Sequence, residues 1–459
     1  MSKEISNEIS ENKMGTMPVG KLLVTMSLPM MASMLVQALY NIVDSIFVSR
    51  ICENALTAVS LAFPIQTIMI GLSTGLGVGM NAVLSRALGS KDNKKVTDAA
   101  MNSLFMTLIN IVIMIFIGLF LVKPFYLSQT KDPEIVGYGV DYLTIVCVAS
   151  FGLFFQIIFE KLLQSTGRTL ESMFSQLLGA ITNIVFDPIL IFGLFGFPKM
   201  GVKGAAIATV MGQIFGSIFA MILNLKRNKE ISFSLKGFRP NGRMIAEIYK
   251  VGLPTIIMQC VGSVMTYAMN RILIVFSSTA TAVFGVYFKL QSFIFMPLFG
   301  LNSGLVPIVA FNYGAQSRKR MTGVIKWAVG IAVAIMSIGT LIFELIPGSL
   351  FGLFDASDYM LSMGVPALRI IAVHFPVAAV CIIFGSVFQA LGNGVYSLIV
   401  SLIRQILVLL PAAYFLSLLG NVDYVWWAFP IAEIASLIVS VICYIRIYNG
   451  VIKKVKLNG

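Results

Sequence analysis

The chain has 459 residues, of which 58% are hydrophobic and only 12% are charged, and its mean hydropathy is +0.90. Soluble globular proteins hold roughly 45–50% apolar and about 25% charged residues, so this composition excludes a water-soluble core. A net charge of +13 is compatible with a nucleic-acid surface, whereas one histidine and five scattered cysteines offer no ligand set for a metal.

Twelve apolar runs along the chain are long enough to cross a membrane. A hydrocarbon core of about 30 Å needs roughly twenty residues of helix, and alternating strands of about ten residues are absent. Each run is therefore predicted to be a transmembrane helix, because a helix satisfies its own backbone groups in lipid. The runs lie at 22–48, 55–84, 98–122, 136–163, 170–195, 202–225, 245–276, 280–311, 322–346, 361–391, 395–419 and 424–448.

The segments between these runs predict the topology. Residues 1–20 are polar and lack the apolar stretch and cleavage site of a signal peptide, so we expect a cytosolic N-terminal tail. If both ends are cytosolic, 24 of the 33 basic residues fall in cytosolic segments, including a linker at 226–244 and a tail at 449–459. Only five fall outside, which is the asymmetry of the positive-inside rule. The charge then reflects a multi-pass protein of the cell membrane, and nucleic-acid binding is not expected.

The two halves of the chain repeat each other at an offset of 225 residues. The offset places Pro29 on Pro254 and Gln66 on Gln291, and it also aligns three glycine pairs: Gly75 with Gly300, Gly79 with Gly304, and Gly89 with Gly314. Each half holds six predicted helices, so both copies share one membrane orientation. The sequence predicts an N-lobe at 21–225 and a C-lobe at 245–448, with a cavity between them.

Acidic residues inside the spans are the first candidates for function, since an ionisable group there costs about 2.5–3.5 kcal/mol on insertion scales. Asp44 lies near the end of the first span, and its plain alternative is a surface pair with Arg50. Asp187 follows Asn183 by four residues, so both side chains face one side of a helix. Pro188 frees a backbone carbonyl there, and Asp187 either satisfies this break or acts with Asp44. Two such carboxylates could take up a proton or coordinate a small cation.

Other polar residues in the spans are weaker candidates. Glu160 either forms a helix-end pair with Lys161 or faces the cavity, where it would attract cations. Gln37 lies two turns before Asp44 on the same face, and its alternative is an ordinary interhelical hydrogen bond. The C-lobe spans hold the basic residues Arg271, Lys289 and Arg369 and the histidine His374. His374 is expected to be buried and satisfied rather than to relay protons.

Prolines mark two predicted kinks. Pro29 and its repeat partner Pro254 lie early in the first and seventh spans. A proline removes one helical hydrogen bond and bends the helix. We therefore expect both helices to bend at these residues, either statically or as a hinge.

Short motifs follow one another in a specific order over residues 20–448. The first half has Ser-Leu-Pro at 27–29, Tyr-Asn-x-x-Asp at 40–44, Ala-Val-Ser at 58–60, Leu-Gly at 88–89, and Asp-Pro at 187–188 ahead of Gly-x-x-Gly-Ala-Ala at 201–206. The second half has Gln-Ser-Phe at 291–293, Gly-Leu-Asn at 300–302, Gly-Leu-Val-Pro at 304–307 and Asn-Tyr-Gly-Ala at 312–315. Together the motifs resemble the multidrug and toxic compound extrusion (MATE) family, DinF-like branch.

The resemblance implies a fold and a function. The fold is an all-α membrane protein of twelve transmembrane helices, arranged as two pseudo-symmetric six-helix lobes around a V-shaped central cavity. The function is a secondary active antiporter, which exports amphipathic and preferably cationic organic compounds in exchange for protons or sodium ions. Such a protein works in the lipid bilayer without enzymatic activity, catalytic residues, cofactor or structural metal, and we expect it to function as a monomer.

The resemblance also assigns roles to individual residues. In the DinF-like branch the first lobe carries the coupling-ion site, and the matching residues here are Asp44, Asn183, Asp187 and Thr209. The substrate cavity is assigned Gln37, Tyr40 and Glu160, and helix bending is assigned Pro29 and Pro254. The chain departs from some relatives at Glu160, where they have an uncharged amide. This difference indicates a preference for cations.

Two other functions stay open on the sequence. A lipid-linked precursor flippase of the same broader superfamily would use basic cavity residues, for which Arg271, Lys289 and Arg369 are available. An intramembrane enzyme would need a nucleophile with a base, or a metal set, and the sequence favours neither. The identity of the substrate, proton against sodium coupling, and the oligomeric state are not decided by the sequence.

Overall fold

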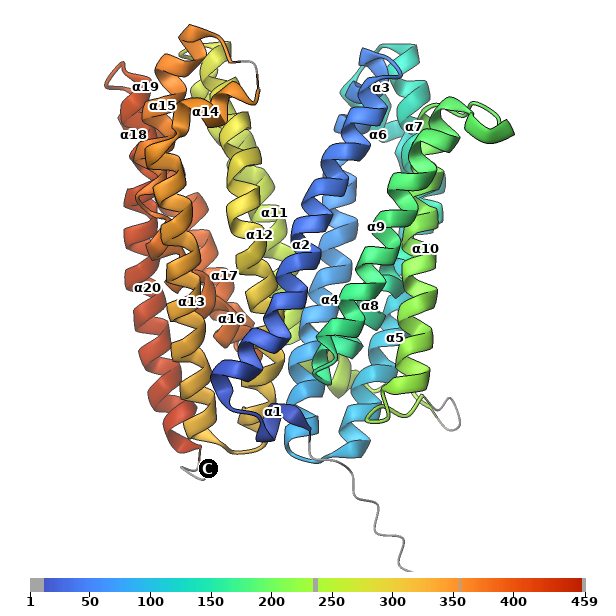
Figure 1. Cartoon of the computed structure of the whole chain (residues 1–459), viewed down its shortest axis with the longest axis vertical. Helices are drawn as coiled ribbons and strands as arrows, with labels where there is room; N and C mark the ends of the chain where they lie inside the picture. The colour runs from blue at the N-terminus through green and yellow to red at the C-terminus, as the bar shows by residue number, and fades with distance from the viewer. Residues whose placement is uncertain (1–11, 234–237, 355, 456–459) are drawn as a thin grey trace, which may run out of the picture.

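The computed structural model describes residues 12–233, 238–354 and 356–455. Within these residues the regular elements are all helical, and they form two bundles that lean apart as a V (Figure 1). The short helix α1 (Lys13–Thr16) and the last helix η4 (Ile452–Lys454) lie at the end where the bundles meet. We call this the closed end and the opposite side the open end.

The first bundle, the N-lobe, contains six spans joined by short connections. Two of the spans are interrupted: one passes through the π-helix η1, and another is bent between α7 and α8. The elements are α2 (Val19–Ser49), α3 (Glu53–Leu61), α4 (Phe63–Gly89), α5 (Asn93–Phe116), η1 (Ile117–Leu121), α6 (Val122–Gln129), α7 (Pro133–Val148), α8 (Phe151–Ser165), α9 (Thr169–Phe192), η2 (Leu194–Gly196) and α10 (Val202–Arg227).

The second bundle, the C-lobe, repeats this plan. Its bent span is α15 with α16, and its π-helical interruption, η3, falls in the following span. The elements are α11 (Gly242–Leu273), α12 (Ser278–Gly314), α13 (Arg318–Leu345), α14 (Pro347–Gly352), α15 (Asp358–Ala372), α16 (Phe375–Ala390), α17 (Gly394–Leu402), η3 (Ile403–Leu409), α18 (Leu410–Ser417), α19 (Val422–Trp426) and α20 (Ala428–Gly450), followed by η4.

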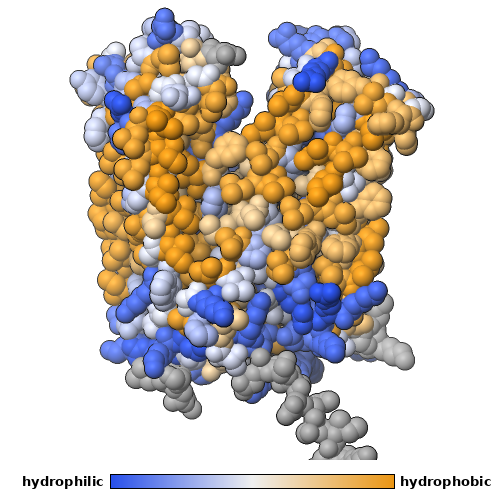
Figure 2. Space-filling view, in the orientation of Figure 1, coloured by the Kyte–Doolittle hydropathy of each residue, from blue (hydrophilic) through white to orange (hydrophobic). Residues whose placement is uncertain are grey.

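The number of spans agrees with the sequence. In the part of the chain that the structure describes, ten helices are long and apolar enough to cross a membrane, and two further pairs are bent by 44° and 50°. With each bent pair counted as one span, the total is twelve. On the face shown in Figure 2, the apolar surface forms a broad band across both lobes, with hydrophilic residues gathered at the two ends. The predicted all-α, two-lobed membrane fold is confirmed.

Several predicted boundaries are wrong for local reasons. The run at 55–84 begins inside α3, a separate short helix, and the span itself starts at Phe63, where a proline occupies the first turn. The run at 170–195 continues past the true end of α9. That helix stops at Phe192 because Gly193 adopts the left-handed conformation, with φ of 74°, that closes a helix end.

The glycines of the internal repeat form the seam between the lobes. In α4, a Cβ atom added to Gly75 would collide with the backbone of Gly252 in α11, and one added to Gly79 would collide with the carbonyl oxygen of Ile248. In α12, the repeat partners Gly300 and Gly304 meet the backbone of α2 in the same way. Small residues thus allow two helix pairs to touch backbone to backbone across the lobes.

The closed end carries a third pair of such contacts, which follow the same pseudo-two-fold relation. A Cβ atom on Gly89 would strike the carbonyl oxygen of Phe311, and one on Gly314 would strike that of Arg86. Residues 86 and 311 differ by the repeat offset of 225, as do 89 and 314. The repeat in the sequence is therefore also a symmetry of the inter-lobe contact.

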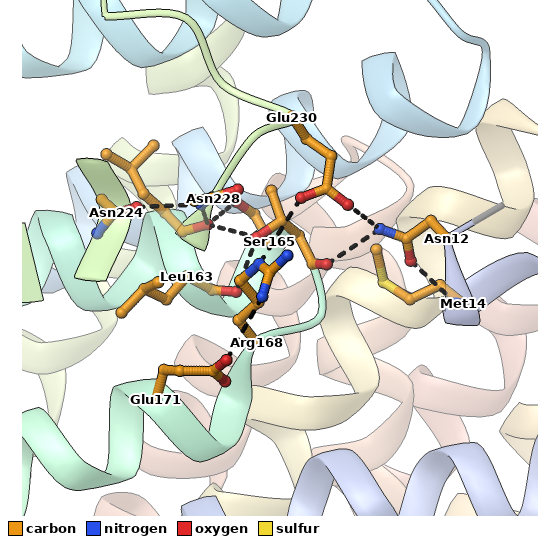
Figure 3. A network of polar contacts seen from close by, with 11 residues as sticks. Asn12, Met14, Leu163, Ser165, Arg168, Glu171, Asn224, Asn228 and Glu230 are labelled. Carbon is orange, nitrogen blue, oxygen red and sulfur yellow. Dashed lines mark hydrogen bonds and ion pairs between the residues drawn. The ribbon is translucent and has the colours of Figure 1, made fainter. Parts of the chain in front are cut away.

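The short helix α1 bridges the lobes at the closed end. Asn12 Nδ2 donates to the carbonyl of Thr166, at 3.0 Å, and to Glu230 Oε1, at 2.8 Å, on the N-lobe side (Figure 3). On the C-lobe side the carbonyl of Met14 accepts from Asn312 Nδ2, at 3.2 Å, and from Arg320 Nη2, at 3.1 Å. The segment is tied to both lobes.

Charged groups join the lobes beside this bridge. Glu247 in α11 lies 3.0 Å from Lys95 Nζ in α5 and 3.6 Å from Arg86 Nη1 in α4. The guanidinium of Arg86 also lies 5.5 Å from the ring centre of Tyr313 in α12. Arg86, Glu247 and Tyr313 border a cavity of about 400 Å³ at the closed end.

Candidate functional site

The central part of the N-lobe is built by close packing of α9 on α10. A ridge of small residues runs along α10 at every fourth position: Gly204, Ala208, Gly212, Gly216 and Ala220. A Cβ atom on Gly212 would lie 2.5 Å from the carbonyl oxygen of Gly179 in α9 and 3.3 Å from Asn183 Cβ. This ridge brings the two helices to backbone contact and sets Thr209 beside Asn183.

Asn183, Asp187 and Thr209 form one hydrogen-bonded group. In the amide orientation that satisfies both neighbours, Asn183 Nδ2 donates to Asp187 Oδ2 at 3.1 Å, and Oδ1 accepts from Thr209 Oγ1 at 3.3 Å. Asp187 has no exposed surface and Asn183 is almost fully buried. Pro188 cannot donate to the carbonyl four residues earlier, so the helix at this point has a free backbone acceptor as well.

Asp44 reaches the same group from α2, which packs against α9. Its carboxyl group lies within hydrogen-bonding range of Asp187, and one of its oxygens, Oδ1, is buried without a partner. Among the described residues Asp44 has no ion pair within 4 Å, so the surface pair with Arg50 is not formed. Two carboxyl groups can approach this closely only if a proton or a cation lies between them.

Two tyrosines complete the surroundings of the carboxyl pair. Tyr40, on α2, lies within electrostatic range of both Asp44 and Asp187. Tyr142, on α7, also lies within electrostatic range of both carboxyl groups. Its hydroxyl accepts a hydrogen bond from Gln66 Nε2 at 3.1 Å. Tyr142 was not predicted from the sequence, because no pattern in the chain links the fourth span to the first and the fifth.

The remaining candidates of the N-lobe lie apart from this group. Gln37 is exposed, and within the described ranges it forms no hydrogen bond. Glu160, in α8, is 4% exposed and accepts from Gln176 Nε2 at 2.7 Å, Gln156 Nε2 at 3.0 Å and Ser175 Oγ at 3.4 Å. It forms no ion pair with Lys161, whose Nζ donates to Gln164 at 2.8 Å. The helix-end pair is therefore absent, and Glu160 belongs to a buried polar cluster.

Both predicted hinge prolines lie inside continuous helices. Pro29 is in α2 and Pro254 in α11, each about ten residues after the helix begins at the closed end. Next to Pro29, the Ser27 hydroxyl donates to the carbonyl of Leu301 in α12 at 3.3 Å. The first ten residues of α2 thus pack on the C-lobe, whereas its far end carries Asp44 to the N-lobe.

The basic residues of the C-lobe spans do not form a cluster. Arg369 lies 3.9 Å from Glu344, and Lys289 lies over the ring of Phe354 at 5.8 Å. Arg271 is exposed. His374 is buried, as expected, and its Nδ1 contacts the carbonyl of Ile371.

A buried ion pair in the C-lobe was missed in the sequence. Arg404 and Glu433 face each other at 3.6 Å, and Glu433 is almost fully buried. Each is a single charged residue within an apolar run of the sequence. This pattern could have identified both residues as candidates.

The geometry of the N-lobe site suits a small positively charged species. The group offers two carboxyl groups, one amide oxygen, one hydroxyl and one free backbone carbonyl, all of them oxygen donors. Hard cations such as sodium prefer such ligands, and closely opposed carboxylates readily share a proton.

Comparison with known proteins identifies the family. The family model described as MatE matches residues 29–189 and again residues 254–415, once in each lobe and over more than half of the chain. The chain belongs to the MatE family. It is therefore a multi-pass membrane transporter and not an enzyme, and the two matches repeat the two lobes of the structure.

Individual relatives in sequence and structure align with this chain over nearly its full length. The multidrug export protein MepA of Staphylococcus saprophyticus is 28% identical over 91% of this chain and 92% of its own, and MepA of Staphylococcus aureus strain MRSA252 is 27% identical over 93% and 94%. Among solved structures, a superfamily transporter from Pyrococcus furiosus and a multidrug resistance MATE transporter in the outward-facing conformation each give a TM-score of 0.90. Both are 26% identical over 97% of this chain and 99% of their own.

Proposed function

We propose that this MatE transporter is a secondary active antiporter, which exports amphipathic and preferably cationic organic compounds in exchange for protons or sodium ions. The observation that carries the proposal is the opposed pair Asp44 and Asp187 beside Asn183 and Thr209 in one lobe, where Asp187 and Asn183 are buried and Asp44 and Thr209 are partly exposed. The resemblance to the DinF-like branch, which stays a prediction, points to the same residues. The full-length similarity to multidrug export proteins supports the substrate class.

The distribution of basic residues indicates how the protein is oriented in the membrane. The closed end holds most of the basic residues, among them Lys94, Lys95, Lys250, Arg318 and Lys319. Positive charge accumulates on the cytosolic side of membrane proteins. We therefore place the closed end and both termini in the cytosol, so that the structure corresponds to an outward-open state in the cell membrane.

The first step of the proposed cycle occurs at the carboxyl pair. A proton or sodium ion that enters from the open end binds between Asp44 and Asp187 and reduces their mutual repulsion. Without the ion, two negative charges keep the surrounding cleft hydrated and attract a cationic compound. Ion and substrate thus compete for the same negative charge, and this competition is enough for coupling.

The second step moves α2. Its first ten residues are held on α12, and its far end reaches α9, so a change at Asp44 acts on the helix section beyond Pro29. A bend at Pro29 would repack α2 against the N-lobe and expel the bound compound. The lobes then rock about the glycine seam and release the ion into the cytosol while new substrate binds.

Glu160 supports the preference for cations. It is a buried acid whose hydrogen-bond partners are all neutral side chains, while the neighbouring Lys161 donates to Gln164 instead. The flippase alternative relies on free basic residues in the cleft. The contacts of Arg369 with Glu344 and of Lys289 with Phe354 weaken that alternative.

The proposal is tested in vesicles that contain the purified protein and a fluorescent cationic dye. A pH gradient and a sodium gradient are applied in turn, with wild type, Asp44→Asn and Asp187→Asn. We expect one gradient to drive dye transport by wild type and both variants to lose at least nine-tenths of it. Asp141→Asn, which removes an exposed acid paired with Lys203 in the same lobe, should retain the activity. Gradient-driven transport by both site variants at the wild-type rate would contradict the proposal.

A further inference from the structure

The cavity of about 400 Å³ at the closed end is lined from both lobes and contains basic groups. Arg86 of α4 lines it from the N-lobe, whereas Lys250 of α11, Tyr313 of α12 and Asn393, just before α17, line it from the C-lobe. Two nitrogens of the Arg86 guanidinium, Nε and Nη2, are buried without a hydrogen-bond partner in the described part of the chain. Buried donors are normally satisfied, so this edge of the guanidinium lacks an acceptor.

The acid beside the cavity is held by another base. Glu247 is the only acid among the residues that line the cavity, and Lys95 Nζ lies 3.1 Å from its Oε1 and 3.0 Å from its Oε2. Arg86 approaches Glu247 only to 3.6 Å, beyond a charge-assisted hydrogen bond of about 2.7–2.9 Å. Lys250 is exposed, and none of the ion pairs in the described ranges includes it. Positive charge is therefore in excess at the cavity.

The internal repeat relates this cavity to the groove that α1 fills. At the offset of 225 residues, Gly167 and Phe311 correspond to Gly392 and Arg86. A Cβ atom added to Gly167 would lie 3.2 Å from the first residue of α1, and one added to Gly15 of α1 would lie 3.2 Å from the ring of Phe311. The helix α1 thus lies between the first pair. In the second pair, a Cβ atom on Gly392 would lie 2.7 Å from Arg86 Nη2, beside the cavity.

The repeat counterpart of α1 packs elsewhere. The offset places α1 on residues 238–241 of the linker. There the ring of Phe238 lies 6.3 Å from that of Phe105, and the backbone N–H of Asn241 donates to Asn102 Oδ1 at 2.8 Å, both on α5. The chain therefore fills one of two related grooves with its own backbone, and the other groove contains the cavity.

The filled groove indicates which chemistry suits the cavity. There Arg320 Nη2 donates to the carbonyl oxygens of Met14 and Met17, at 3.1 and 2.6 Å. At the cavity the donors are a guanidinium edge and an ammonium group, which suit an acceptor with several oxygens and a negative charge. Nε and Nη2 lie on one edge of the guanidinium, the arrangement that binds two oxygens of one phosphate group. We propose that the closed-end cavity binds a phosphate group between Arg86 and Lys250.

The site can be reached by the flexible ends of both side chains. The Arg86 side chain is 22% exposed, so a small rotation turns its buried edge toward the cavity. Lys250 contributes a point charge from the other lobe. A phosphate group bound to both residues links the lobes and stabilises the closed end. The phosphate can belong to a free anion or to a lipid headgroup, since basic pockets between spans on the cytosolic side bind anionic headgroups.

The experiment measures binding without transport, so its failure would leave the proposed antiport untouched. The full-length protein carries Asn393→Cys in the cavity wall, and its labelling by a neutral, water-soluble maleimide is followed with a correction for the native cysteines. One arm adds inorganic phosphate to the protein in detergent at constant ionic strength. The other arm compares vesicles of phosphatidylcholine alone with vesicles that also contain phosphatidylglycerol.

We expect inorganic phosphate to slow the labelling if the site takes a free anion, and phosphatidylglycerol to slow it if the site takes a lipid headgroup. Arg86→Gln should raise the concentration needed for half of this protection about tenfold, because it removes charge-assisted hydrogen bonds. Lys250→Gln should also raise it, and this exposed residue can be replaced even if Arg86→Gln does not fold. Lys319→Gln removes an equally exposed charge outside the cavity and should leave the protection unchanged. Labelling that neither arm slows, or protection that is equal in Lys250→Gln and Lys319→Gln, would overturn the proposal.

Discussion

Asp187 is fully buried, yet it contacts one amide and a second acid rather than a basic residue. Carboxylates that stabilise a fold are usually paired with a cation, because an unpaired buried charge is costly. The local sequence could predict Asp44 and Asp187 as candidates, since each is an isolated acid in an apolar run. It could not predict Tyr142, or that Arg404 meets Glu433, because those contacts depend on how separate spans pack.

Thr209 allows a test of the site that leaves the carboxylates intact. Thr209→Val keeps the shape of the side chain and removes the hydroxyl that Asn183 contacts at 3.3 Å. One such hydrogen bond contributes about 0.5–1.5 kcal/mol, which corresponds to a roughly two- to tenfold loss of affinity for the coupling ion. The measurement is the ion concentration that half-displaces a bound dye. Thr74→Val, whose hydroxyl only bonds its own helix, is the control, and an equal effect of both substitutions would refute the prediction.

Glu160 makes a separate prediction about stability. Glu160→Ala leaves the amide donors of Gln156 and Gln176 without their acceptor, at a cost of about 1–3 kcal/mol for a buried unsatisfied group, whereas the Ser175 hydroxyl keeps the carbonyl of Gly216 at 2.8 Å. We expect a clear fall in the melting temperature of the detergent-solubilised protein and a smaller fall for Glu160→Gln. Glu134→Ala removes an exposed acid that accepts from Asn54 and should change the melting temperature little. Equal melting temperatures for the two alanine variants would show that the buried cluster contributes nothing.

At the scale of helices, the repeat offset and the glycines were visible in the sequence, but their partners were not. The structure shows that Gly75 meets Ile256 and that Gly300 meets Met31, which are positions related through the repeat. The bend between α15 and α16 has a local cause, since Pro376 follows it in the first turn of α16. The bend between α7 and α8 at Ala149 and Ser150 has no proline, and no local pattern predicts it.

The glycine contacts between the lobes predict that the same substitution, glycine to alanine, changes stability and transport differently at different positions. Gly79→Ala forces α4 and α11 apart, since the new methyl group meets the backbone at Ile248, and overpacking of this kind costs about 1–3 kcal/mol. Gly330→Ala, in α13, meets nothing within 4 Å and should leave stability unchanged or raise it by up to about 1 kcal/mol. Thermal unfolding and gradient-driven transport both report the difference. Equal behaviour of the two variants would mean that the seam does not constrain the lobes.

At the scale of the whole molecule, the outward-open shape depends on contacts at the closed end. The helix α1 and the ion pairs of Glu247 with Lys95 and Arg86 cross between the lobes there, on partly exposed surface. Partly exposed ion pairs contribute about 0.2–1 kcal/mol each. Contacts of this strength can hold one state and still be broken in every cycle. The sequence predicted two lobes and a cavity, but not which end is closed, because that depends on inter-lobe contacts.

Removal of the charge at Glu247 should open the closed end more often. Glu247→Gln weakens both cross-lobe pairs, and a change of about 1 kcal/mol corresponds to roughly a fivefold change in population. The readout is labelling of Asn393→Cys, at the rim of the closed-end cavity, by a water-soluble thiol reagent, corrected for the native cysteines. Asp141→Asn, whose partner Lys203 belongs to the same lobe, should not change the labelling. A labelling rate unaffected by Glu247→Gln would exclude this pair as part of the closed gate.

The most direct test of the central claim is the competition between ion and substrate at the carboxyl pair. Equilibrium binding of a fluorescent cationic dye to the purified protein is measured while protons and sodium ions are raised in turn. For wild type we expect one of these ions to displace the dye, and we expect the displacement to disappear in Asp44→Asn and in Asp187→Asn. Displacement that persists unchanged in both variants would contradict ion binding at the carboxyl pair, because the ion would then act elsewhere in the molecule.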